Sequence, residues 1–287
     1  MSDDFEKKII VLFDEYGTPT LSLNRVQDIF LGVSVLYELS EEDNIFNRCD
    51  TNMGLSKSNP LKNDQISVSK AIDISKVLGK QALSISAKYL TLNNPALKDI
   101  IEIYKPFANF TRKIWREIKK ERKDVQILYP QILERCIFDI IARYLESVDS
   151  GKYVFQIFID DWGFPKPDEH IALNFGKSSL EKKVRQFIVH DIKKDSDISI
   201  IEKNLLKDPN SRRKRFIDVL TSVISRAFRD KNDSKYDITP FKELQNQLKN
   251  NFNVEDMTYD VISFLKDIIL KGIHETKEKE KRLLIYK

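Results

Sequence analysis

Three separated stretches of the chain bring carboxylates to positions where they could do chemistry, and the first lies near the start. The apolar run Ile9–Phe13 leads directly into Asp14 and Glu15, and Gly17 and Pro19 then end the run. A run that is apolar at every position is typical of a central strand buried on both faces. Charge is rarely placed at the half-desolvated end of such a strand without a use. Asp14 and Glu15 are therefore the first candidates for a functional site.

A second strand and a later helix carry the other acids. The run Tyr153–Ile159 leads into Asp160 and Asp161, and Arg215–Leu220 places Asp218 in the apolar face of an expected helix. Carboxylate oxygens are the ligands that hard divalent cations prefer. Three carboxylate sites on elements that can converge predict a divalent-metal cluster.

The composition excludes several classes of protein. Of the 287 residues 41% are hydrophobic, which is enough for a core, and 48 basic against 44 acidic residues give a net charge of +4. The apolar runs are about half as long as the ~20 residues that a membrane span requires. The acidic start Met1–Glu6 does not resemble a signal peptide. Cys49 and Cys136 have no metal-site spacing, so we expect reduced thiols and a cytoplasmic protein without a membrane segment.

The order of expected elements favours an α/β fold. We expect strands at Ile9–Phe13, Ile29–Tyr37, Leu83–Leu92, Tyr153–Ile159 and Ile198–Ile201, and helices over about 66–78, 95–123, 129–149, 178–190 and 212–229. Residues 38–59 are expected to be irregular, Pro106 to break one helix, Pro130 to begin another and Ser178 to cap a third. The order predicts a mixed sheet with helices on both faces.

The pattern beyond Asp237 predicts a helical appendage. We place one domain at 1–232 and a helical C-terminal extension with a charged tail at 233–287. An apolar stripe on the extension is too wide for a free surface helix; it comprises Met257, Val261, Phe264, Leu265 and Ile268. We expect it to be buried against the main domain or against a second copy of the chain.

Four stretches, in order, resemble the family of domains of unknown function 3800 (DUF3800). Phe13-Asp14-Glu15-Tyr16-Gly17 is similar to that family's Asp-Glu-Ser-Gly motif, and Pro60–Ile66 to its lysine segment. Phe158–Asp161 resembles its middle acidic strand, and Phe216–Ile224 its late acidic helix. The resemblance covers roughly residues 8–230. It implies an RNase H-like fold in which strand-end and helix acids bind Mg²⁺ or Mn²⁺ for nucleic-acid cleavage, and it is compatible with roles in mobile elements and antiphage defence.

The resemblance gives the acids distinct roles. Asp14 would bridge two metal ions from the central strand, Asp160 would bind from the neighbouring parallel strand, and Asp218 from the helix. Glu15 and Asp161 are second choices, because alternation along a strand points each away from its neighbour. The alternative is that these acids cap elements or pair with arginines.

Several basic residues could contact a nucleic-acid substrate. Lys62 could contact a phosphate, and Arg212, Arg213 and Arg215 precede Asp218 closely enough to do the same. The alternatives are a solvated loop lysine and a solvated helix start. The basic stretch Arg112–Lys123, which includes Trp115, could track a nucleic-acid backbone or form a charged solvent face.

Two functions follow. The first is a metal-dependent nuclease that hydrolyses phosphodiesters with two metal ions held by carboxylates. The second is a non-catalytic RNase H-like scaffold that binds nucleic acid or a protein partner, or self-associates, through its C-terminal helices. The intact acids favour the nuclease, whereas Tyr16 in place of the family's serine and the mild net charge leave room for the scaffold.

Overall fold

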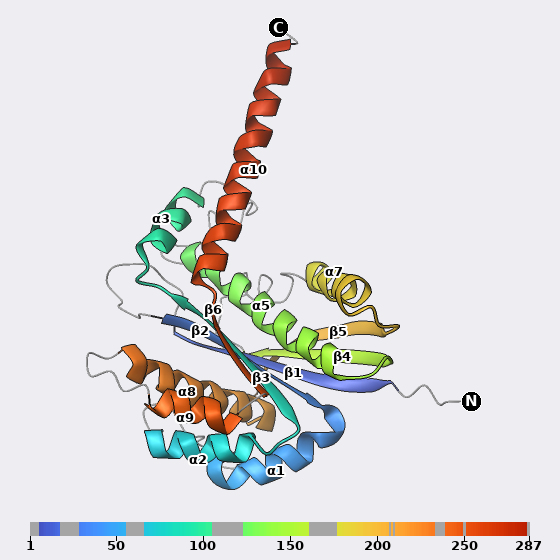
Figure 1. Ribbon diagram of the computed structural model, residues 1–287, viewed down its shortest axis with the longest axis vertical. Helices are drawn as coiled ribbons and strands as arrows, with labels where there is room; N and C mark the ends of the chain where they lie inside the picture. Colours follow the sequence, from blue (N-terminus) through green and yellow to red (C-terminus); the bar gives the residue numbers. More distant parts are fainter. Residues whose placement is uncertain are drawn as a thin grey trace. The chain divides into compact units, whose positions relative to one another are not determined.

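The central strand predicted from Ile9–Phe13 is the middle of a six-stranded mixed sheet. β1 (Lys7–Tyr16) pairs antiparallel with β2 (Ile29–Glu38) on one side and parallel with β4 (Lys152–Asp160) on the other. The other strands are β3 (Leu83–Thr91), β5 (Asp197–Leu206) and β6 (Phe252–Asp256). The strand order is β5-β4-β1-β2-β3-β6, and β4 and β5 are parallel. All five residues of Ile9–Phe13 are completely buried, because helices cover both faces (Figure 1). The prediction of a mixed sheet between helices is confirmed.

The computed structural model describes residues 6–17, 29–55, 66–104, 123–160, 177–206, 208, 210–232, 239–248 and 251–285. Its helices are α1 (Glu42–Met53), α2 (Val68–Leu78), α3 (Pro95–Tyr104), α5 (Lys123–Ser147), α7 (Lys177–Phe187), α8 (Arg212–Asn232), α9 (Thr239–Leu248) and α10 (Thr258–Ile285), with a short 3-10 helix at Leu39–Glu41 and a short π-helix at Ile188–Ile192. Among the helices it describes, none is long and apolar enough to cross a membrane.

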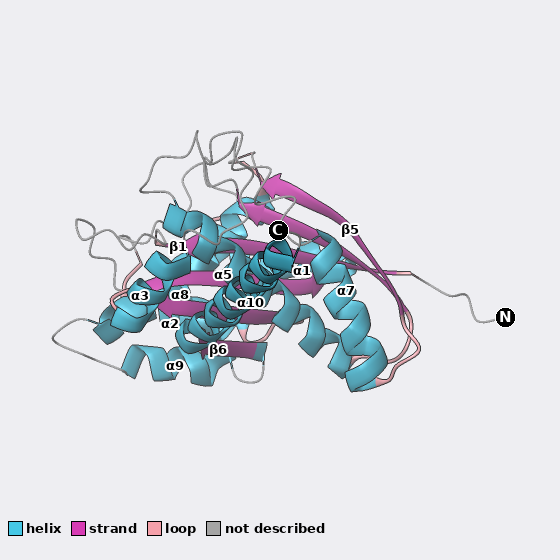
Figure 2. Ribbon diagram, turned by 90° about the horizontal axis from the view of Figure 1, so that it is seen from above, coloured by secondary structure: helices cyan, strands magenta, loops and turns pink. Residues whose placement is uncertain are grey.

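Two compact units divide the chain, and the larger, here the sheet unit, carries the predicted acids. It comprises Met1–Tyr16, Leu31–Lys88 and Ile132–Glu255. Within it α1, α2, α8 and α9 cover one face of the sheet, and α7 with the later part of α5 covers the other (Figures 1 and 2). The sheet therefore forms the middle layer of three.

The smaller unit, here the α3–α10 unit, comprises Gly17–Phe30, Tyr89–Gln131 and Asp256–Lys287. Its helices α3 and α10 pack on each other. The backbone N–H of Met257 donates to the carbonyl of Tyr89 at 2.8 Å, just before α10 begins. Within these units, α9 and residues 252–255 of β6 belong to the sheet unit, and the division at 232/233 stays a prediction.

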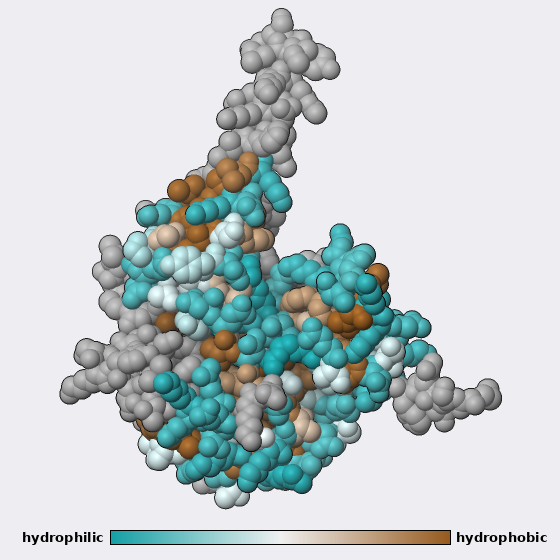
Figure 3. All heavy atoms as spheres, viewed as in Figure 1, coloured by the Kyte–Doolittle hydropathy of each residue, from teal (hydrophilic) through white to brown (hydrophobic). Residues whose placement is uncertain are grey.

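The predicted apolar stripe, which runs from Met257 into α10, is buried in part. Met257, Val261 and Leu265 are at most 4% exposed, Ile268 is partly exposed, and Phe264 is 38% exposed. Three further large apolar side chains of the α3–α10 unit are exposed, namely Ile103, Tyr259 and Leu270. The surface of the unit has an apolar area (Figure 3).

Several element boundaries differ from the predictions. Residues 42–53, predicted to be irregular, form α1, and residues 252–256 form β6 inside the predicted helical extension. α5 begins at Lys123, so Pro130 lies inside the helix and does not begin it. Ser178 is the second residue of α7 rather than its cap. Helix ends assigned from sequence commonly shift by a residue or more, and in α1 the burial of Ile45, Phe46 and Cys49 stabilises a helix whose local signal is weak.

Gly79 follows the last residue of α2, where a glycine usually allows a left-handed backbone conformation. Its φ of −63° lies in the ordinary helical region, so no left-handed conformation requires glycine. A Cβ at this position would instead clash with the backbone carbonyl of Gln247 in α9. We expect Gly79→Ala to lower the free energy of unfolding by about 1–3 kcal/mol, since a main-chain atom must move to relieve the overlap.

Urea unfolding followed by circular dichroism measures this loss. Gly151→Ala is the matched control, because a Cβ there meets ordinary contacts at 3.5 Å from the Tyr153 hydroxyl, and we expect a change within about 0.5 kcal/mol. Equal stability of the two variants would show that α9 does not hold its backbone against Gly79.

Candidate functional site

Asp14 lies on the face of the sheet that α8 covers. Side chains alternate along a strand, so Asp14 shares its face with Ile10. Ile10 is paired with Tyr37, whose ring packs edge-on against Phe216 of α8 with centroids 6.5 Å apart. Asp14 is only 8% exposed, and it interacts with other groups, as a buried carboxylate must.

Glu15 lies on the opposite face, toward α5. It is paired with Gly32, where a Cβ would overlap the side chain of Ile132 in α5. Asp14 and Glu15 therefore lie on opposite faces of the sheet, Asp14 toward α8 and Glu15 toward α5. This supports the choice of Asp14 as the first candidate ligand.

Asp160 occupies the position on the neighbouring strand β4 that corresponds to Asp14 on β1. Phe13 is paired with Ile159 in the parallel β1–β4 ladder, so the backbones of Asp14 and Asp160 come next to each other at the ends of the two strands. On its other side Asp160 is paired with Leu206 of β5. The register thus brings two of the three predicted positions together.

Part of the predicted site lies outside the described residues. This holds for the side chain of Asp160, for Asp161, for Lys62 and for most of the basic stretch Arg112–Lys123. Their roles stay predictions.

Asp218 lies in the second turn of α8 with its side chain 33% exposed. Lys214, one turn earlier, has its ammonium 4.0 Å from Asp218 Oδ1. Thr221, one turn later, is 3% exposed, and its hydroxyl has no hydrogen-bond partner in the described part of the chain. Residues spaced by three and four share one side of a helix, so these three form a polar strip on α8.

Arg213 fixes the start of α8 to its surroundings. Its guanidinium donates to both carboxylate oxygens of Glu42, at 2.7 and 3.1 Å, and lies 4.4 Å from the ring centre of Phe158. Glu42 also accepts from the Tyr37 hydroxyl at 2.9 Å. Burial and this carboxylate raise the pKa of Tyr37 well above its ordinary value. These contacts join α8 to α1, β2 and β4.

Arg212 and Arg215 also contact the protein itself. Arg212 donates to Asn47 at 2.9 Å, and Arg215, 6% exposed, donates to the carbonyl of Leu55 at 2.8 Å. The three arginines predicted to bind substrate thus all have intramolecular partners. Their contacts support the alternative of a structural helix start, and substrate contact by them stays a prediction.

The donor chemistry of the site suits a hard divalent cation. Asp14, Asp218 and the unpartnered hydroxyl of Thr221 offer oxygen atoms, and the Lys214 ammonium shows that Asp218 already attracts a cation. Among the described side chains, no three of His, Cys, Asp and Glu are placed to hold one ion. A complete cluster would therefore need a ligand such as Asp160.

The two cysteines do not form a second chemical site. Cys49 and Cys136 are both free and buried, and burial raises the pKa of Cys49 to about 12 and that of Cys136 still further. Thiols in this state are weak nucleophiles.

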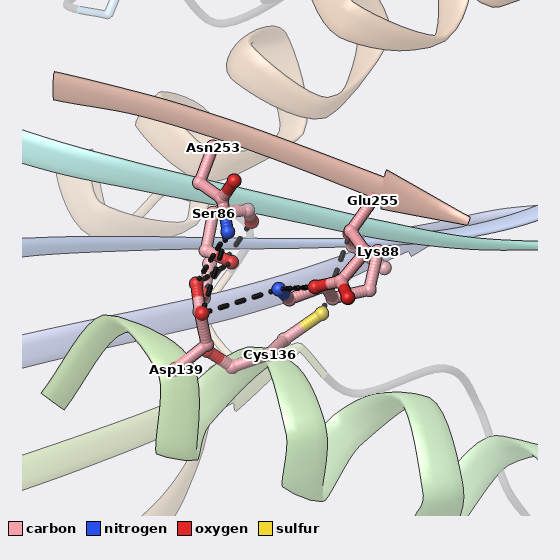
Figure 4. A network of polar contacts seen from close by, with 8 residues as sticks. Ser86, Lys88, Cys136, Asp139, Asn253 and Glu255 are labelled. Carbon is pink, nitrogen blue, oxygen red and sulfur yellow. Dashed lines mark hydrogen bonds and ion pairs between the residues drawn. The ribbon is translucent and has the colours of Figure 1, made fainter. Parts of the chain in front are cut away.

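The sequence analysis missed a buried polar network on the α5 face (Figure 4). The Lys88 ammonium, on a residue only 2% exposed, lies 3.2 Å from Asp139 Oδ1 and donates to Glu255. Asp139 also accepts from the Ser86 hydroxyl at 2.7 Å and from the Asn253 amide at 3.1 Å. The network joins β3, α5 and β6. A lysine in the middle of a strand in which polar and apolar residues alternate was the signal that could have revealed it.

No model of a known protein family matches this chain. None of the curated proteins matches its sequence either.

Proposed function

We propose that this protein is a cytoplasmic, divalent-metal-dependent nuclease with an RNase H-like fold. The observation that carries the proposal is the register that sets Asp14 beside Asp160 at the ends of parallel strands, on a sheet whose Asp14 face is covered by the helix bearing Asp218. The strand order β3-β2-β1-β4-β5, with an antiparallel and a parallel neighbour for β1, supports the RNase H-like part. The resemblance to DUF3800 supports a role in antiphage defence or mobile-element biology.

The candidate site contains metal ligands and residues that position them. Asp14, Asp160 and Asp218 would hold Mg²⁺ or Mn²⁺, with Asp161 as a further candidate and Glu15 the less suited because it lies toward α5. A bound pair of such ions supplies an activated water and stabilises the leaving oxygen. Arg213 and Glu42 hold the first turn of α8 against β4 and so position Asp218. Low exposure at Asp14 keeps water from screening its charge.

A cleavage assay tests this function. The full chain is incubated with single-stranded DNA, duplex DNA and RNA in Mn²⁺, Mg²⁺ or EDTA. We expect at least one substrate to be shortened with a divalent ion and none in EDTA. Cleavage that persists in EDTA, or no cleavage of any substrate, would contradict the proposal.

The non-catalytic scaffold is favoured by a separate observation. Tyr259 and Leu270 of α10 are 71% and 64% exposed, which is unusual for large apolar side chains and suits contact with a protein partner or a second copy. Sedimentation of the full chain and of a Tyr259→Ser/Leu270→Ser variant separates the cases. A self-associating wild type and a monomeric variant would support a scaffold that pairs through α10.

A further inference from the structure

The four basic residues 212–215 at the start of α8 differ in what they contact. Arg212 and Arg213 contact α1, Arg213 also contacts β4, and Arg215 donates to the carbonyl of Leu55, which follows α1. Lys214 instead lies 4.0 Å from Asp218, with the side chains 17% and 33% exposed respectively. The charge of Lys214 therefore acts on a candidate metal ligand.

The position that the Lys214 ammonium occupies beside Asp218 also suits a divalent metal cation. Opposite charges at this separation attract more strongly when both are partly withdrawn from water, since solvent screens them less. The buried hydroxyl of Thr221, on the same side of α8, adds an oxygen that no described group uses. Lysine carries its charge on a flexible four-carbon stem, so the ammonium can leave without moving the helix.

We infer that Lys214 is a built-in counter-cation of Asp218, which a divalent ion must displace in order to bind. The inference rests on the proposed function and adds the regulation of its metal site. Lys214 neutralises Asp218 in the metal-free protein and raises the metal concentration needed to fill the site. Removing its charge strengthens metal binding, which a purely structural lysine would not do.

Direct titration with Mn²⁺ in the absence of nucleic acid tests this. We compare the full-length wild type with Lys214→Gln and Lys214→Met, and follow free Mn²⁺ by electron paramagnetic resonance. Both variants are expected to bind Mn²⁺ about tenfold more tightly. Lys214→Arg keeps the charge and should restore an affinity within about twofold of wild type.

Lys76→Gln is the matched control, because Lys76 pairs with Asp73 at 3.3 Å on an exposed part of α2. It should leave the affinity unchanged. Equal Mn²⁺ affinity in wild type and both neutral variants would overturn the inference alone, with the metal site intact. No Mn²⁺ binding by wild type and variants would overturn the inference together with the proposed metal site.

Discussion

Asp139→Ala is expected to lower the free energy of unfolding by about 3–5 kcal/mol. The Lys88 side chain is 3% exposed, and the substitution leaves it with one carboxylate partner in the described part of the chain, Glu255, which is itself 47% exposed. Removing one partner of a buried pair is this costly because the remaining charge stays out of water without compensation. Ser86 and Asn253 lose an acceptor at the same time. Urea unfolding monitored by circular dichroism gives the difference.

Two companion variants separate charge from packing. Replacing both partners, as in Lys88→Met/Asp139→Leu, should recover most of the loss, since apolar groups of similar volume often substitute for a buried ion pair without penalty. Glu255→Gln should cost about 1 kcal/mol or less, because that carboxylate is 47% exposed. Strictly additive losses in the double variant would show that Lys88 and Asp139 are not coupled.

Asp14→Asn is expected to reduce nuclease activity by more than about 100-fold. Loss of a group that only hydrogen-bonds to a metal ligand already lowers activity by up to about 100-fold, and loss of the ligand itself should cost more. The same change should leave the fold intact or slightly more stable without metal. Asp14 is 8% exposed, so its charge is costly to bury, and a neutral amide removes both that cost and any repulsion from nearby acids. Stabilisation by Mn²⁺ should disappear together with activity, while nucleic-acid binding through Lys and Arg should persist.

Thermal melts with and without Mn²⁺, beside the cleavage assay, measure both effects. Glu15→Gln is the matched control: it removes an adjacent carboxylate that lies toward α5, and it should retain activity. If Asp14→Asn cleaves as well as wild type, Asp14 is not a ligand and the scaffold becomes the better account.

The centre of the fold could be predicted because local pattern and burial agree there. Ile9–Phe13 is apolar at every position and is buried on both faces, so its composition identified it without knowledge of its neighbours. α1 could not be predicted in the same way. Its buried residues Ile45, Phe46 and Cys49 have helical spacing, but acidic and polar residues between them hide the pattern.

In the candidate site, too, the residues with a local sequence signal could be predicted and the others could not. A strand that ends in acids marks Asp14 and Asp160 from sequence, and strand register then brings them side by side. The roles within residues 212–215 depend on which distant element each side chain meets, and four basic residues in a row look alike in sequence. Lys88 and Glu255 are 167 positions apart, so no local pattern could have paired them.

The place of β6 at the edge of the sheet has a consequence for biosynthesis. β3 borders β2 on one side, and its other side is covered by β6, a strand that comes far later in the sequence. A ribosome must therefore release residues 252–256 before that edge can close, and until then β3 presents unpaired main-chain groups. Nascent chains of this protein are expected to depend on chaperones that shield strand edges until residues 252–256 have emerged.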